Sequence, residues 1–180
     1  MTQELKIPND RIGVIIGKHG ETRKNLEKLL GVTLEVDSKD GLVTITNEDD
    51  AVAEIRSMEI IKAIGLGFSP ERARKLLEDD NMVLDLIDIS DAANTMQKLS
   101  RIRGKIIGRD GKAREQIENM TGTYISVYGK TIGIIGIPNQ VNDAHTAVLM
   151  LISGSDHNTV FKFLDRKKKE ARMNVISYYY

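Results

Sequence analysis

The chain contains an internal repeat, and this repeat constrains the fold more than any other feature of the sequence. Residues 13–36 align with residues 104–127 without a gap, and nine positions are identical. The identical positions are Gly13, Ile15, Ile16, Gly17, Gly20, Arg23, Glu27, Gly31 and Val36 in the first copy, and Gly104, Ile106, Ile107, Gly108, Gly111, Arg114, Glu118, Gly122 and Val127 in the second. Such a repeat indicates one structural unit used twice. We therefore expect two domains of the same fold.

Each copy centres on two glycines that enclose a pair of residues with at least one cation. The loops are Gly17-Lys18-His19-Gly20 and Gly108-Arg109-Asp110-Gly111. Glycine has no β-carbon, so the chain can turn sharply there and expose its N–H groups. The helix predicted after each loop adds unpaired amides and the positive end of its dipole. Each loop is therefore a predicted binding site for an anion such as phosphate.

Apolar periodicity and turn residues predict the same order of elements in both copies: strand, helix, glycine loop, helix, strand, strand and helix. In the first copy a strand is predicted at 5–7, before Pro8, and a helix capped by Asn9 or Asp10 ends at Ile16. A second helix follows at 22–30. Two strands, at 32–36 and around 43–45, are joined by Asp40-Gly41, and a last helix is capped by Asn47. The apolar face of that last helix is predicted to hold Ala51, Ile55, Met58, Ile61 and Ile64.

The second copy is predicted with the same order, apart from an insertion at 91–100 between its first strand and first helix. Its elements are expected at 84–89, 101–107, 112–120, 123–127, 132–135 and 141–151. The predicted divisions of the chain are a first domain at 1–66, a helical connector at 67–82, a second domain at 83–155, and a basic C-terminal helix and tail at 156–180. The connector begins with Ser69 as helix cap and Pro70 in the first turn. Because the helix at 51–64 is apolar on several faces, we expect the two domains to pack as one unit.

A three-stranded antiparallel sheet with three helices and a Gly-x-x-Gly loop between the first two helices is the type I KH module, an α+β fold. KH modules clamp about four nucleotides of single-stranded nucleic acid. In this interpretation the loop amides and cations meet phosphates, and the bases lie on an aliphatic groove. The predicted RNA-binding residues are Ile15, Ile16, Gly17, Lys18, His19, Gly20, Arg23 and Lys24 in the first copy, and Lys105, Ile106, Ile107, Gly108, Arg109, Asp110, Gly111, Lys112, Arg114, Ile125, Val127 and Lys130 in the second.

Composition limits the other possibilities. The chain has 26 basic and 26 acidic residues, so any nucleic-acid binding depends on local segregation of charge. The absence of cysteine excludes disulfides, cysteine-bound zinc and thiol catalysis. No apolar run has the length of a membrane span. We expect a cytoplasmic protein without a cofactor, a metal or a small-molecule substrate.

Two enzymatic alternatives fit the sequence less well. The stretch from Gly13 to His19 is one residue short of a P-loop and has histidine where a magnesium-binding hydroxyl belongs. The aspartates at 79, 80, 85, 88 and 91 suggest a metal-dependent nuclease, but a solvated strand edge and helix end explain them equally well. No nucleophile with a base is evident, and we expect no enzyme. A KH-fold interaction protein with little RNA affinity remains an alternative, and the basic run at 166–169 fits either a solvated helix face or an RNA-binding surface.

Several longer motifs carry a family resemblance. They are GFSPERA at 67–73, RGKIIG at 103–108, TGTYISVYGKT at 121–131 and HNTVFKFLDRKKK at 157–169. With them, nearly the whole chain resembles the tandem-KH Krr/Pno/Dim group of ribosome-biogenesis proteins, and the intact first loop is similar to that of archaeal members. This resemblance implies binding near the 3′ end of small-subunit (16S) pre-rRNA during its processing, without catalysis by this chain. It also implies a pre-ribosomal particle and an rRNA-processing endonuclease as partners.

Overall fold

The computed structural model describes residues 2–179, which form two compact units. One unit ends at Asp80 and the other begins at Asn81. Each contains a three-stranded antiparallel sheet, in which the third strand of the unit lies between the first and the second. The predicted α+β class and the type I KH order of elements are therefore confirmed in both units.

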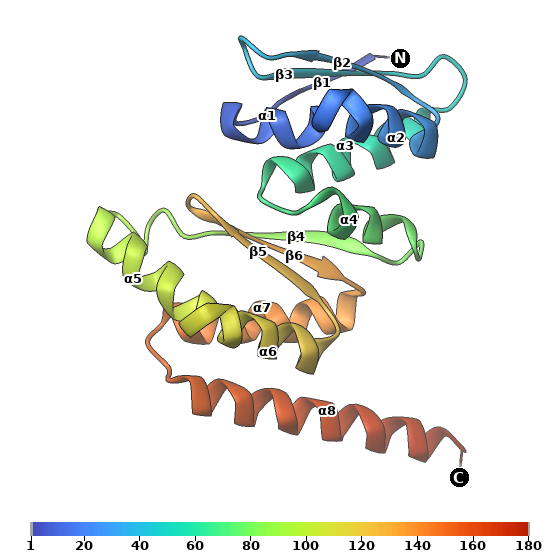
Figure 1. The fold of residues 1–180 in the computed structure, drawn as a ribbon. Coiled ribbons are helices and arrows are strands. Elements are labelled where there is room, and N and C mark those ends of the chain that lie inside the picture. The colour runs from blue at the N-terminus through green and yellow to red at the C-terminus, as the bar shows by residue number, and fades with distance from the viewer. Residues whose placement is uncertain (1, 180) are drawn as a thin grey trace. The chain divides into compact units, whose positions relative to one another are not determined.

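The first unit places its helices α1, α2 and α3 on one face of its sheet (Figure 1). Its elements are β1 (Thr2–Lys6), α1 (Asn9–Ile16), η1 (Lys18–Gly20), α2 (Glu21–Leu30), β2 (Thr33–Asp37), β3 (Leu42–Thr46), α3 (Ala51–Gly65), α4 (Pro70–Ala73) and η2 (Arg74–Leu77). Alternation along the central strand explains this layering, because Val43 and Ile45 are fully buried while Thr44 between them is half-buried.

The second unit repeats this layering and adds a long helix. Its elements are β4 (Val83–Asp88), α5 (Met96–Ile107), η3 (Arg109–Gly111), α6 (Lys112–Thr121), β5 (Tyr124–Tyr128), β6 (Thr131–Gly136), α7 (Pro138–Ile152) and α8 (His157–Tyr179). The first turns of α8 pack on α6 and α7 and bury Val160 and Leu164. Its last turns are exposed, including Met173, Tyr178 and Tyr179. The third terminal tyrosine, Tyr180, lies outside the described residues.

Two predicted helix caps are wrong. The first helix begins at Asn9, and its N-cap is Pro8, with no side-chain hydrogen bond. The helix α3 is capped by Asp50, whose carboxylate accepts hydrogen bonds from the N–H groups of Val52 and Ala53. Asn47 instead donates from its side chain to the carbonyl of Gly31 at 2.8 Å, and so joins the end of β3 to the end of α2.

Several predicted boundaries and one predicted face also need correction. The strand β1 starts at Thr2 rather than at Leu5, and α8 continues to Tyr179. Half of the inserted segment at 91–100 is helical, because Thr95 caps α5 through the N–H of Lys98. On α3, Ala51 and Ile55 are exposed, whereas Glu54 and Ser57 are buried.

The connector belongs to the first unit. Ser69 and Pro70 begin α4 as predicted, and Ser69 Oγ accepts from the N–H of Arg72 at 3.3 Å. The guanidinium of Arg11 on α1 fixes the turn before α4, because it donates to the carbonyls of Ile64 and Phe68 at 2.9 and 2.8 Å. Only residues 78–82 lie between η2 and β4.

Candidate nucleic-acid interface

The two glycine loops have the same backbone conformation. Gly17 has φ 72° and ψ 177°, and Gly108 has φ 73° and ψ 179°, in a region that is essentially open to glycine alone. Gly20 and Gly111 are left-handed and lead directly into α2 and α6. Both loops therefore end a helix, turn sharply and begin another helix within a few residues.

The residue before the second glycine is also left-handed in each loop. His19 has φ 53° and Asp110 has φ 55°, and within residues 2–179 these are the only non-glycine residues with positive φ. Histidine and aspartate are among the side chains that tolerate this region best. A strained conformation at the same place in both copies marks a candidate functional site.

Close packing explains why the first glycine of each loop has no side chain. A β-carbon on Gly108 would lie 2.5 Å from the β-carbon of Ala113, and one on Gly17 would overlap the hydroxyl of Thr22. The helix that follows each loop therefore lies directly against the first glycine. A β-carbon on Gly20 would meet open space, so the second glycine is required by its backbone angles alone.

Some N–H groups of the predicted anion site already donate hydrogen bonds within the loop. The N–H of Gly17 donates to Gly13 at 2.9 Å and that of Gly20 to Gly17 at 3.2 Å, and the second loop repeats both bonds. In this structure these glycine amides therefore already have acceptors within the loops. The N–H groups of Lys18 and His19, and those of Arg109 and Asp110, open the short helices η1 and η3, and the first amides of a helix have no acceptor within that helix. Two consecutive N–H groups at each loop tip remain available for an anion.

Cationic side chains surround each loop tip. Lys18 and Lys24 are exposed in the first unit, as are Arg109 and Lys112 in the second. Among the described residues, none of these four cations forms an ion pair or a side-chain hydrogen bond. Asp110 is exposed beside Arg109 and reduces the positive charge of the second loop.

Three of the predicted groove residues belong to the core instead. Ile15 and Ile106 are 0% exposed and Ile125 is 1% exposed, so these side chains support the groove from beneath and have no surface for a ligand. Ile16 and Ile107 are half-buried. On the bordering strands the predicted Val127 is half-buried as well, and so is its counterpart Val36. The exposed aliphatic surface beside each loop is therefore narrower than the sequence predicts.

Two further predicted residues, Lys130 and Lys105, lie away from the loop tips. Lys130 is exposed at the turn between β5 and β6, near Asp88. Hydrogen bonds from Ser90 hold the pKa of Asp88 below its ordinary value, and the charge of Lys130 contributes in the same direction. Lys105 lies in the last turn of α5, and its carbonyl is 2.7 Å from Nε2 of His157. No pattern in the sequence predicts this link between α5 and the start of α8.

The basic run of α8 is partly neutralised by acidic residues on the same helix. Lys169 pairs with Asp165 at 2.9 Å, and Lys167 pairs with Glu170 at 3.6 Å. Exposed pairs of this kind contribute little to stability, but they lower the local positive charge. The helix is therefore a weaker candidate for phosphate binding than the loops.

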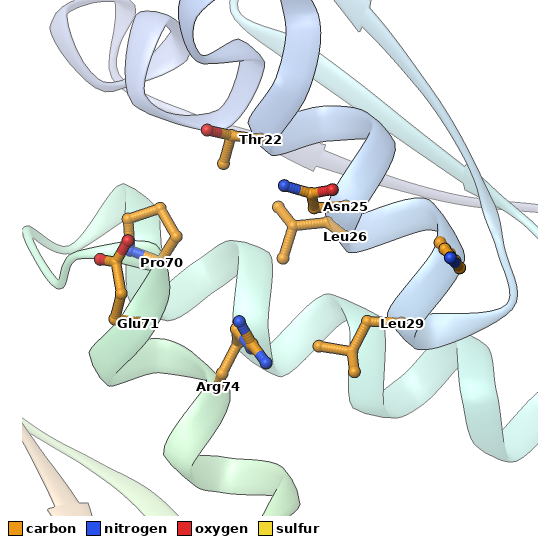
Figure 2. Close-up of a pocket in the computed structure, with 8 residues that line it drawn as sticks. Thr22, Asn25, Leu26, Leu29, Pro70, Glu71 and Arg74 are labelled. Carbon is orange, nitrogen blue, oxygen red and sulfur yellow. The ribbon is translucent and has the colours of Figure 1, made fainter.

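A hollow lies between α2 and α4 in the first unit, and the sequence did not predict it. Figure 2 shows Thr22, Asn25, Leu26 and Leu29 of α2 facing the residues of α4 and η2 across it. Its lining mixes apolar and charged side chains, among them Lys28, Glu71 and Arg74. We assign no ligand to this hollow.

Other polar groups of the second unit are structural. His145 of α7 lies 2.5 Å from the carboxylate of Asp85 on β4, so both side chains hold the helix to the sheet.

Residues 2–179 hold no group of three histidine or acidic side chains with the geometry of a metal site. In the same range, no helix combines the length and the apolar character that a membrane span requires.

Comparison with known proteins identifies similar domains at both loops. Residues 2–58 match the model of the KH domain, and residues 83–169 match that of the eukaryotic type KH-domain, KH-domain type I. The KH domain-containing protein MJ0443 of Methanocaldococcus jannaschii is 46% identical over 93% of this chain and 74% of its own length. The RNA-binding protein PNO1 of Oryzias latipes is 34% identical over 66% of this chain, and the match spans 49% of PNO1.

Solved structures show the same architecture. Dim2p from Pyrococcus horikoshii is 44% identical with a TM-score of 0.85, and the match covers 92% of this chain and 99% of that one. A chain of the a/eIF2alpha-aDim2p-rRNA complex from the same organism is 44% identical with a TM-score of 0.88, covering 94% of this chain and 95% of that one. The chain spans about half the length of several PNO1 relatives and 68% of the length of two others.

Proposed function

The chain belongs to the family of tandem KH-domain proteins that includes archaeal Dim2p and the PNO1 pre-rRNA-processing proteins, and on this premise we propose that it binds single-stranded RNA through its two glycine loops. The observation that carries the proposal is the repeated loop tip. In each unit two consecutive N–H groups open a short helix that supplies no acceptor for them, next to an exposed cation and the N-terminus of the following helix. This combination binds phosphate oxygens.

The narrow aliphatic surface beside each loop supports the rest of the mechanism. A phosphate held at the loop tip directs its nucleotide toward Ile16 and Val36 in the first unit, or toward Ile107 and Val127 in the second. These half-buried side chains offer apolar contact to a base, which requires an unpaired strand. The buried isoleucines beneath them keep the surface rigid.

We further propose the 3′ region of small-subunit pre-rRNA as the ligand. The longer motifs of the chain resemble the Krr/Pno/Dim group, and the relative from Pyrococcus horikoshii is described in a complex with rRNA. In this role the protein is a cytoplasmic ribosome-biogenesis factor that binds within a pre-ribosomal particle. Cleavage is then the work of a separate rRNA-processing endonuclease, and this chain positions the RNA.

A second candidate function is a KH-fold interaction protein with little RNA affinity. The formal net charge of +0 and the intrahelical ion pairs of α8 favour it. The complex of the relative also contains a/eIF2alpha, which fits a role in a protein assembly.

A salt titration of RNA binding separates the two candidates. The probe is a fluorescent oligonucleotide with the 3′-end sequence of 16S rRNA, and its affinity is measured by anisotropy from low to high salt. RNA binding through the loops predicts an affinity that falls with salt, with a logarithmic slope of about −0.7 for each phosphate neutralised. An affinity that is negligible at every salt concentration would leave the interaction protein as the better account.

A further inference from the structure

Two arginines share an unusual feature. Among the described residues, only the Nε atoms of Arg23 and Arg114 are buried side-chain nitrogens or oxygens without a hydrogen-bond partner. These arginines occupy the same position in the internal repeat, three residues after the second glycine of each loop. The same unpaired group in both copies indicates a common role.

The position of each arginine on its helix brings its guanidinium toward the loop. In the second unit, Nη2 of Arg114 is 3.8 Å from the point that a β-carbon on Gly111 would occupy. Helical side chains lean toward the N-terminus of their helix, which directs both arginines back toward the loop tips. The guanidinium therefore lies on the side where the unpaired N–H groups and the helix dipole favour an anion.

The glutamate best placed on the helix to accept from each arginine accepts a backbone N–H instead. A glutamate follows each arginine by four residues, which is the spacing of a helical ion pair. Glu27 instead accepts the N–H of Leu34 at 2.9 Å, and Glu118 accepts the N–H of Ile125 at 2.7 Å. Neither arginine forms an ion pair within residues 2–179.

A buried N–H without an acceptor destabilises the free protein. The presence of this unpaired N–H in both units is explained by an acceptor on a bound ligand. The planar fork of a guanidinium matches two oxygens of one phosphate, which an ammonium group cannot match. Phosphate is also the group that the neighbouring loop amides bind.

We propose that Arg23 and Arg114 are specific phosphate-binding residues. Each donates hydrogen bonds from Nε and an Nη nitrogen to one RNA phosphate beside its glycine loop. The guanidinium turns outward when RNA binds, because Nε is buried in the free protein. This inference rests on the proposed RNA-binding function. It requires the guanidinium rather than any positive charge.

The test compares two substitutions at each position. Arg114→Lys keeps the charge and loses the fork, while Arg114→Met removes the charge and the buried donor; Arg23 receives the same pair. Lys28→Gln is the matched control, because it removes a charge from α2 on the side of the hollow with α4. The measurements are RNA affinity, its salt slope, and the melting temperature without RNA.

We expect Arg→Lys to weaken binding about tenfold with an unchanged salt slope, because a charge-assisted fork is lost while the charge stays. Arg→Met should weaken binding further and reduce the slope by about 0.7. The melting temperature of Arg→Met without RNA should not fall, since a buried unpaired donor has been removed. Lys28→Gln should bind like the parent protein.

Three outcomes would overturn the inference. One is a lysine variant that binds like the parent, and another is a methionine variant with a lower melting temperature, which indicates a structural role. The third is a loss confined to oligonucleotides with one particular base, which indicates base recognition. If Arg109→Asp weakens binding and these variants do not, this inference fails while the proposed function stands.

Discussion

The carboxylate of Glu118 accepts the backbone N–H of Ile125 at 2.7 Å, and this bond connects α6 to the beginning of strand β5. The same bond occurs in the first unit between Glu27 and Leu34, at 2.9 Å. In both units this bond joins the helix that follows the glycine loop to the strand that borders the aliphatic surface. It therefore fixes the distance between the phosphate-binding and base-binding parts of the candidate interface.

Replacing Glu118 should destabilise the second unit. Glu118→Ala leaves the N–H of Ile125 buried without this partner, and we expect the free energy of unfolding to fall by about 1–3 kcal/mol. Urea denaturation measures the change, with Glu118→Gln as the control that keeps an acceptor. Glu27→Ala should have a smaller effect, because Glu27 is half-buried whereas Glu118 is buried. An unchanged stability of Glu118→Ala would show that the bond does not fix the strand.

The two glycines of one loop should respond differently to alanine. Gly108→Ala brings a β-carbon within 2.5 Å of Ala113 and forces alanine into a conformation reserved for glycine, at about 1–3 kcal/mol for the backbone alone. Gly111→Ala meets only ordinary contact and a left-handed backbone, at about 1–2 kcal/mol. Denaturation of the two variants should therefore rank Gly108→Ala as the less stable. The reverse order would contradict the loop geometry.

Asp143 should make stability depend on pH. Burial raises the pKa of Asp143 and the charge of Glu170 adds to this effect, while Lys167 opposes it. The ionised carboxylate is thus less favourable in the folded state than in the unfolded state at neutral pH. Asp143→Asn should raise the melting temperature at pH 7, and the gain should disappear as the pH falls below the ordinary value of 3.8. A gain of equal size at both pH values would contradict this account.

The two units should tumble together in solution. The sequence predicts this because the helix at 51–64 is apolar on several faces, and only residues 78–82 lie between η2 and β4. NMR relaxation of backbone amides measures a rotational correlation time for each unit. We expect the same value for both, and clearly different values would show that they move independently.

Much of the fold could be predicted because the repeat and the turn residues act locally. Gly31 and Gly122, two of the repeated positions, end their helices in the left-handed conformation that glycine adopts most readily. The errors arose where tertiary contacts decide. Asn47 has the chemistry of a helix cap, but its Oδ1 accepts the N–H groups of Asp49 and Asp50 in the turn before the helix, and Asp50 takes the cap. Periodicity also could not show that Ile55 faces solvent while Glu54, an acidic residue, is buried on α3.

The candidate interface was predictable to a similar degree. The glycine spacing located both loops, but it could not show which amides are used internally or that Ile15 and Ile106 are fully buried. Contacts between distant residues left no local signal. The bond between His157 and Lys105, 52 residues apart, is one example.

Reversing charge at the loop tips tests the RNA-binding account most directly. Lys18→Asp with His19→Asp alters the first loop, and Arg109→Asp alters the second, while the glycines stay in place. Each change puts negative charge where a phosphate must lie, so the loss should exceed that of one phosphate contact. Lys28→Asp, which alters a residue lining the hollow between α2 and α4, is the control for charge reversal.

The decisive measurement is the affinity of each variant for a 3′-end 16S rRNA oligonucleotide, made after equal melting temperatures have been shown. The account predicts that both loop variants bind about tenfold more weakly or worse, with the larger loss for Arg109→Asp because the second copy carries the closer family motifs. The control should bind like the parent protein. If both loop variants bind as tightly as the parent, the glycine loops do not hold the RNA and the account is wrong.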